Sequence, residues 1–276
     1  MNILKFIESF TNEGLIKSLG EKHSRRESFS QFGNIGKTAA LAAAPFGLAA
    51  LLAPTKARAA SAAFFTTTVE TPTQALQLAL TLEYLEDEFY QIALDTNGLI
   101  PQADRAIIAQ ISQHEAAHVE FLRSALGDNA PDKPTFDFTG GQGNPGGPFN
   151  PFENYEVFLA LSQAFEDTGV RAYKGQAGNL MSQPDLLQAA LQIHSVEARH
   201  ASQIRRLRGQ KGWIEGNDRG GLPEAAQAVY DGEQNTMQAG FNTATVPNIP
   251  AGAGSESYDE PLTGTQASDI AGLFIV

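Results

Sequence analysis

The chain has 276 residues and contains no cysteine. This absence excludes a disulfide framework, an iron–sulfur cluster and zinc held by thiolates. Any metal ion that the protein binds must therefore be held by carboxylates and imidazoles. Apolar residues make up 42% of the chain and charged residues 18%, which is ordinary for a globular protein long enough to bury a core.

Positive charge is scarce outside the N-terminal segment. Eight of the 19 Lys and Arg residues fall within positions 1–60, together with four of the 31 acidic residues. The remainder of the chain has 11 basic and 27 acidic residues, a net charge of 11 − 27 = −16. A surface of that sign repels nucleic acid and anionic lipid and attracts cations. We therefore expect metal ions, and no nucleic acid, among its partners.

The N-terminal segment has the three parts of an export signal of the twin-arginine type. The sequence SRRESF at 24–29 precedes the apolar run LAAAPFGLAALLAP at 41–54, and a small-x-small site follows at 57–59. The run is too short to span a bilayer in a mature protein. We predict that residues 1–59 are removed, that residues 60–71 form a linker, and that the protein is periplasmic or extracellular.

A retained N-terminal anchor is the alternative to cleavage. Residues 1–22 precede the arginine pair and form an unusually long, amphipathic n-region that includes ILKFIESF. With the signal removed, the mature form is expected to have no stable membrane span.

From residue 72 onward, apolar residues recur at helical spacing in four segments. The first two, about 72–95 and 101–127, are joined by a short turn that contains DTNG. The last two, about 153–180 and 184–208, are joined by MSQPD. The stretch at 128–152 is rich in Gly and Pro and cannot be a helix or a central strand.

A short loop, a long crossover and a second short loop are the connectivity of an all-α four-helix bundle with one crossover. We therefore predict such a bundle over residues 72–208. Residues 209–276 form a C-terminal extension, with a short helix expected over 223–238 and an extended tail that docks on the bundle. The basic run at 205–208 is expected to be a solvated helix end.

The two predicted hairpins contain the same residue types at the same spacings. Glu83 lies seven residues before Tyr90 in the first helix, and Glu166 lies seven residues before Tyr173 in the third. HEAAH at 114–118 and VEARH at 196–200 both contain Glu-x-x-His. The matching positions are 83 residues apart in the first case and 82 in the second, so the two hairpins indicate an internal duplication.

Glu-x-x-His in a helix presents a carboxylate and an imidazole on one face. Glu115 with His118, and Glu197 with His200, provide two such pairs. With one glutamate from each of the other helices, four carboxylates and two imidazoles converge, enough for two divalent metal ions. The nitrogen ligands favour iron or manganese over calcium.

At these residues the sequence resembles the ferritin-like superfamily, and especially bacterial exported ferritin-like-domain proteins related to plant desiccation-associated proteins. The resemblance covers about 70–210. It implies a centre of two iron or manganese ions that oxidises Fe(II) or breaks down peroxide, with oxygen or peroxide as the reacting partner. The implied ligands are Glu83, Glu115, His118, Glu166, Glu197 and His200, with Tyr90 and Tyr173 as partners of these ligands.

The chain departs from its relatives in two respects. Related di-iron oxygenases often carry Asp directly before the Glu of each E-x-x-H, where it can orient an imidazole across the site, but this chain has His114 and Val196. The lack of cysteine also removes the rubredoxin-like electron-transfer module of rubrerythrins.

Some positions have competing interpretations. Glu86, Asp87 and Glu88 lie close to Glu83, Asp167 adjoins Glu166, and the two tyrosines could be ordinary core residues. His194 lies three residues before Glu197, as His200 lies three after it. Only the forward spacing is common to both hairpins, so we predict His118 and His200 as ligands, with His114 and His194 flanking.

Two other functions remain open from the sequence. HEAAH also fits the H-E-x-x-H motif of zinc metalloproteases, in which His114 and His118 would bind zinc, although the second hairpin has Val196 at the first position. The other alternative is a metal-binding or stress-protective bundle without turnover. Four carboxylates inside a bundle repel one another unless they are protonated or bound to metal. Homo-oligomerisation is left open.

Overall fold

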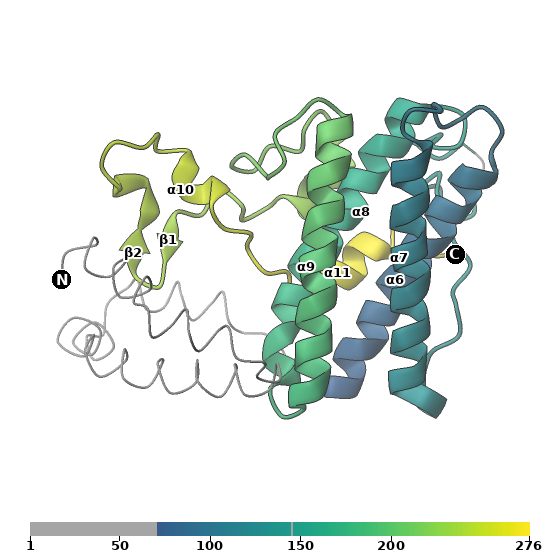
Figure 1. The fold of residues 1–276 in the computed structure, drawn as a ribbon, viewed down its shortest axis with the longest axis horizontal. Coiled ribbons are helices and arrows are strands. Elements are labelled where there is room, and N and C mark those ends of the chain that lie inside the picture. Colours follow the sequence, from purple (N-terminus) through teal and green to yellow (C-terminus); the bar gives the residue numbers. More distant parts are fainter. Residues whose placement is uncertain (1–70, 145) are drawn as a thin grey trace, which may run out of the picture. The chain divides into compact units, whose positions relative to one another are not determined.

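Four long helices form a bundle in the computed structural model, which describes residues 71–144 and 146–276. The helices of the bundle (Figure 1) are α6 (Pro72–Asp95), α7 (Arg105–Leu126), α8 (Tyr155–Gln176) and α9 (Pro184–Leu207). Helix α6 packs along α7 and α8 along α9, and the two hairpins meet where α6 contacts α8. The predicted all-α bundle with one long crossover is confirmed.

The N-terminal predictions concern residues that the structure does not describe. The export signal predicted at 1–59 and the linker up to residue 70 lie outside the described residues. Within the described part of the chain, no helix combines the length and the apolar character that a membrane span requires.

Local sequence signals set where the helices begin. Thr71 caps α6 by accepting a hydrogen bond from the backbone N–H of Gln74, and the Gln74 side chain accepts from the backbone N–H of Thr71. Asn154 caps α8 in the same manner through its side-chain oxygen. Pro72 and Pro184 occupy the first turns of α6 and α9, where a missing N–H costs nothing. Side-chain caps therefore define the N-terminal ends of α6 and α8.

The crossover between α7 and α8 is packed against the bundle. After the short 3-10 helix η1 (Gly127–Asn129) it runs past Phe138 and Phe149, which are buried in an aromatic cluster with Phe89, Phe165 and Phe274. The backbone N–H of Phe149 donates to the carbonyl of Thr139 at 3.0 Å. A Cβ at Gly147 would lie 2.3 Å from that carbonyl, so the loop closes here because the residue is glycine.

The C-terminal extension begins beyond α9 and contains only short elements. They are η3 (Glu224–Val229), β1 (Met237–Gln238), β2 (Phe241–Asn242), η4 (Thr243–Thr245), α10 (Ala253–Glu256) and α11 (Gly264–Ala271). The helix expected over 223–238 is thus only a 3-10 helix, because Gly232 has a positive φ of 95° and a β-hairpin follows. The tail expected to be extended contains α11, which begins with a capping box at Thr263 and Gln266.

Arg171 of α8 connects the extension to the bundle. Its side chain is buried, and its Nε lies 2.8 Å from Glu233 Oε1. The same guanidinium donates to the carbonyls of Glu260 at 2.7 Å, Asp231 at 2.8 Å and Val229. One buried cation therefore connects α8 to two separate segments of the extension, residues 229–233 and the segment at Glu260.

The basic run at 205–208 is not a solvated helix end, and that expectation was wrong for Arg205. Arg205 is buried and forms an ion pair with Asp167 of α8. The Tyr230 hydroxyl donates to the same carboxylate at 2.8 Å. The reason for the difference is that the extension covers this end of α9 and removes it from water.

The segment around α11 lies directly against α8 and α6. The backbone N–H of Leu262 donates to the carbonyl of Arg171 at 3.0 Å. A Cβ at Gly175 would lie only 1.8 Å from the carbonyl oxygen of Leu262. The extension therefore docks on α8 at backbone contact distance.

This close contact predicts that Gly175→Ala destabilises the protein. Ala in place of a helical Gly normally stabilises by about 0.5–1 kcal/mol, but here the new methyl group meets backbone, and overpacking of this kind costs about 1–3 kcal/mol. Gly178→Ala is the matched control, because its Cβ would have open space. Urea unfolding of both variants measures the effect, and equal or greater stability in Gly175→Ala would contradict the docking described.

Candidate metal centre

The six predicted ligands meet in the interior of the bundle, and all four long helices contribute. Each of the six is buried, with at most 9% of its surface exposed. The first helix of each hairpin, α6 or α8, supplies one glutamate, and the second helix, α7 or α9, supplies one Glu-x-x-His pair. The residues are Glu83, Glu115, His118, Glu166, Glu197 and His200.

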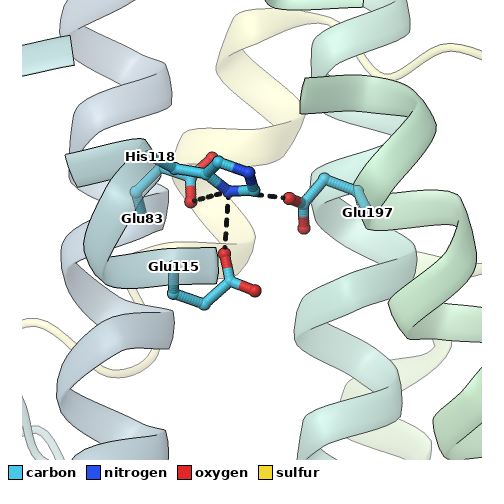
Figure 2. Close-up of side chains that lie close together, drawn as sticks. All are labelled: Glu83, Glu115, His118 and Glu197. Carbon is cyan, nitrogen blue, oxygen red and sulfur yellow. Dashed lines mark hydrogen bonds and ion pairs between the residues drawn. The ribbon is translucent and has the colours of Figure 1, made fainter. Parts of the chain in front are cut away.

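The first cluster surrounds the imidazole of His118 (Figure 2). Its Nδ1 lies 3.1 Å from Glu83 Oε2, 3.0 Å from Glu115 Oε2 and 3.1 Å from Glu197 Oε1. One ligand atom from each of the four residues lies within 4.8 Å of every other. Three carboxylates and one imidazole therefore point at a single small volume.

The second cluster surrounds His200 in the same way. Its Nδ1 lies 2.8 Å from Glu115 Oε1, 3.3 Å from Glu166 Oε2 and 3.9 Å from Glu197 Oε2. These four residues also offer ligand atoms within 4.8 Å of one another. Each cluster thus has one imidazole, one carboxylate of its own and two carboxylates that it shares.

The shared carboxylates are those of Glu115 and Glu197. Each directs one oxygen toward His118 and the other toward His200. Among the residues that the structure describes, six buried side-chain N or O atoms have no hydrogen-bond partner, and five of them belong to these clusters. Atoms that converge without hydrogen-bonding one another fit a pair of bridged metal ions, because ligand atoms then face the ions.

The two tyrosines connect the hairpins reciprocally. The Tyr90 hydroxyl on α6 donates to Glu166 Oε1 on α8 at 2.5 Å, and the Tyr173 hydroxyl on α8 donates to Glu83 Oε1 on α6 at 2.5 Å. Both tyrosines are buried. Each therefore holds the unshared carboxylate of the opposite hairpin, and the repeat found in the sequence is a repeat in space.

Residues 71–210 match the family model described as the ferritin-like domain. The match covers 140 of the 276 residues, slightly more than half of the chain. The chain belongs to the ferritin-like family. In this ferritin-like protein the matched segment contains all four long helices and both clusters, and ends where the C-terminal extension begins. A search of curated proteins gives no match.

A fifth carboxylate, that of Glu86, lies beside the clusters, although the sequence pattern indicates it only as a competitor of Glu83. Glu86 is 2% exposed. The duplication places Gly169 at the matching position in α8, and a Cβ there would lie 3.3 Å from Glu197 Oε2 and 3.5 Å from Glu86 Oε1. The sequence contained one sign of this role, because the position that holds Glu86 in the first hairpin holds Gly169 in the second.

The remaining competitors lie elsewhere. Glu88 pairs with Lys133 at 2.7 Å, and Asp87 is half-buried beside Gln91. Asp167 belongs to the Arg205 pair described above.

Of the two flanking histidines, only His114 touches the centre. Its ring stacks on that of His200, with the ring centroids 5.1 Å apart, but it belongs to neither cluster. His194 is half-buried and also belongs to neither. Glu115 contacts both predicted ligand histidines, His118 and His200. In a zinc site of the H-E-x-x-H type the glutamate would instead act as a base and would not be a ligand.

Burial and mutual repulsion change the ionisation of the centre. Burial raises the pKa of Glu115 to about 7, while the neighbouring imidazoles of His118 and His200 lower it. Burial, with the charges of Glu115 and Glu83, raises the pKa of Glu197 well above its usual range. Burial lowers the pKa of His200, but Glu166 and Glu115 outweigh it and raise the value to about 11. Without metal, protons must neutralise the carboxylates.

We predict that the metal-free protein loses stability as the pH rises from 5 to 8. The pKa of Glu115 is about 4.5 in the unfolded chain and about 7 in the folded protein. Between these two pH values the folded state therefore holds a proton that the unfolded state has released. The pKa of His200 is raised from its ordinary value of 6.5 to about 11. His200 therefore contributes stability below pH 6.5 that is lost as the pH rises toward 11. Both effects have the same sign.

Melting temperatures of chelator-treated protein across this pH range measure the effect. Glu115→Gln removes one titrating group and should flatten the decline between pH 5 and 7. Bound metal should reduce or reverse the decline, because metal replaces the protons. A metal-free protein that gains stability between pH 5 and 8 would contradict the account.

Proposed function

We propose that the protein binds two iron or manganese ions, one in each cluster, with Glu115 and Glu197 as bridging ligands. The observation that supports this most strongly is the sharing of these two carboxylates between clusters that each add one imidazole and one further carboxylate. Carboxylate oxygen with imidazole nitrogen suits iron or manganese better than calcium. The excess of acidic residues outside positions 1–60 favours the approach of cations.

The protein side chains would neutralise the charge of the metal ions, orient the ligand carboxylates and exclude large substrates from the centre. The carboxylates offset the charge of the ions, and Tyr90 and Tyr173 hold Glu166 and Glu83 in place. Ligands no more than 9% exposed leave no room for a large substrate beside the metal. When bound, ions of this kind supply redox chemistry with oxygen or peroxide. We therefore propose that the protein oxidises Fe(II) or breaks down peroxide.

The second candidate is a bundle that holds the metal without turnover. It is favoured by the lack of cysteine, since no thiolate-bound electron donor can belong to this chain. Anaerobic loading followed by addition of oxygen or hydrogen peroxide separates the two. Stoichiometric consumption that repeats with each addition of Fe(II) supports the redox function, and stable binding without consumption supports the second candidate.

The ligand assignment predicts which histidines are needed for metal. His118→Ala and His200→Ala should each lower the metal content well below two ions per chain, because each removes the only imidazole of one cluster. His194→Ala is the matched control and should retain two ions, as should His114→Ala at saturating metal. Elemental analysis decides between these outcomes. Loss of metal in His114→Ala with retention in His200→Ala would favour a zinc site at HEAAH instead.

Metal should also stabilise the fold. Binding neutralises four clustered carboxylates and occurs only in the native state, so it shifts the unfolding equilibrium by mass action. Chelation should therefore lower the melting temperature at pH 7.5, and restored metal should recover it. Identical melting of stripped and loaded protein would contradict the converging site.

We further propose that the protein is exported by the twin-arginine route and cleaved near Ala59. This rests on SRRESF, the apolar run and the small-x-small site. Because that route carries folded proteins, the metal could be loaded before export. Intact mass of the native protein should show a start near Ala60, and Arg25→Lys with Arg26→Lys should block export. Retention of Met1 would contradict cleavage, and unchanged export of the double variant would contradict the route.

A further inference from the structure

His114 of α7 makes two contacts that the ligand set does not explain. Its Nδ1 lies 2.8 Å from His200 Nε2 on α9, and the two rings are nearly parallel, with 12° between their planes. Its Nε2 lies 2.8 Å from the side-chain amide of Gln110, one turn earlier on α7 and exposed. A chain of three polar groups thus runs from the surface to a predicted ligand.

The orientation of His200 makes the first contact consequential. Its Nδ1 faces Glu115 and Glu166, so this is the nitrogen directed at the proposed metal position. An imidazole that binds metal through Nδ1 must have its lone pair there and its proton on Nε2. That Nε2–H needs an acceptor, and His114 Nδ1 lies at hydrogen-bond distance from it.

The matching position in the other hairpin holds no such acceptor. The offset of 82 that aligns Glu115 with Glu197 aligns His114 with Val196. Both residues are half-buried beside a buried glutamate, so the two positions are alike in the fold. Valine has no polar side-chain atom. Val196 therefore cannot accept a hydrogen bond from His118, whereas His114 can accept one from His200.

We propose that His114 is a positioning residue for the His200 half of the centre, where it accepts the Nε2–H of His200 and holds Nδ1 toward the metal. The affinity of the His200 position for metal therefore depends on residue 114, and that of the His118 position does not. The inference rests on the proposed dinuclear centre, and it makes the two metal positions unequal although their ligands are alike in type.

The three-group chain fits both the empty and the loaded centre. In both states His200 Nε2–H donates to His114 Nδ1. His200 Nδ1 faces Glu115 and Glu166, and it carries a proton only when no metal is bound. His114 Nε2–H then donates to the amide oxygen of Gln110, which rotation of that exposed amide presents.

Titration with Mn(II), followed by the paramagnetic resonance signal of the free ion, tests the proposal without any turnover. His114→Ala should weaken one of the two binding steps about 10- to 100-fold, the usual effect of removing a partner from a metal-bound histidine, and leave the other step unchanged. His114→Asn should restore most of the affinity, because its Oδ1 is attached at the same distance along the side chain as Nδ1. His194→Ala is the control and should bind like the unmodified protein.

Double variants assign the affected position. In a His200→Ala background, His114→Ala should cause no further loss, because the ring that it orients is gone; in a His118→Ala background, the full loss should remain. Equal loss in both backgrounds, or equal loss in His114→Asn and His114→Ala, would overturn the positioning role. Two unchanged binding steps in His114→Ala would overturn it too, while leaving the dinuclear centre intact. An unmodified protein that binds neither Mn(II) nor, in an anaerobic titration, Fe(II) would instead refute the proposed function.

Discussion

Buried carboxylates that repel one another determine how the interior of the bundle is built. Glu83, Glu115, Glu166 and Glu197 are all fully buried, and Glu86 lies beside them. Charges removed from water in this manner are tolerated only when they are paired, protonated or bound to metal. The two imidazoles lie between the carboxylates, the two tyrosines donate to those not shared, and the aromatic cluster and α11 shield the bundle from water.

Most of the bundle and the convergence of six side chains at its centre could be predicted because their signals are local and repeated. Helical spacing gave the four segments, and the common offset between E-x-x-H pairs selected His118 and His200 over their neighbours. The contacts of Arg171 and Arg205 could not be predicted, since their partners lie in a C-terminal extension without strong periodicity. Burial of Arg205 reversed the expectation of a solvated helix end, because tertiary contacts outweigh the local preference for cations there.

The duplication is most informative where it fails. Glu86 faces the space left by Gly169, and His114 is matched by Val196. Both exchanges lie next to the ligands, and both place a polar group in the first hairpin where the second has none. The six predicted ligands therefore have an approximate two-fold arrangement, while their surroundings do not. Two ions bound in such a centre would experience different environments, which would allow one to be bound more firmly than the other.

Anomalous diffraction from crystals of metal-loaded protein, recorded on both sides of the iron and manganese edges, tests the central claim most directly. Two peaks per chain are expected, one near His118 with Glu83 and one near His200 with Glu166, both beside Glu115 and Glu197. A single peak held by His114 and His118, or the lack of any peak between α7 and α9 in protein that contains metal, would contradict it.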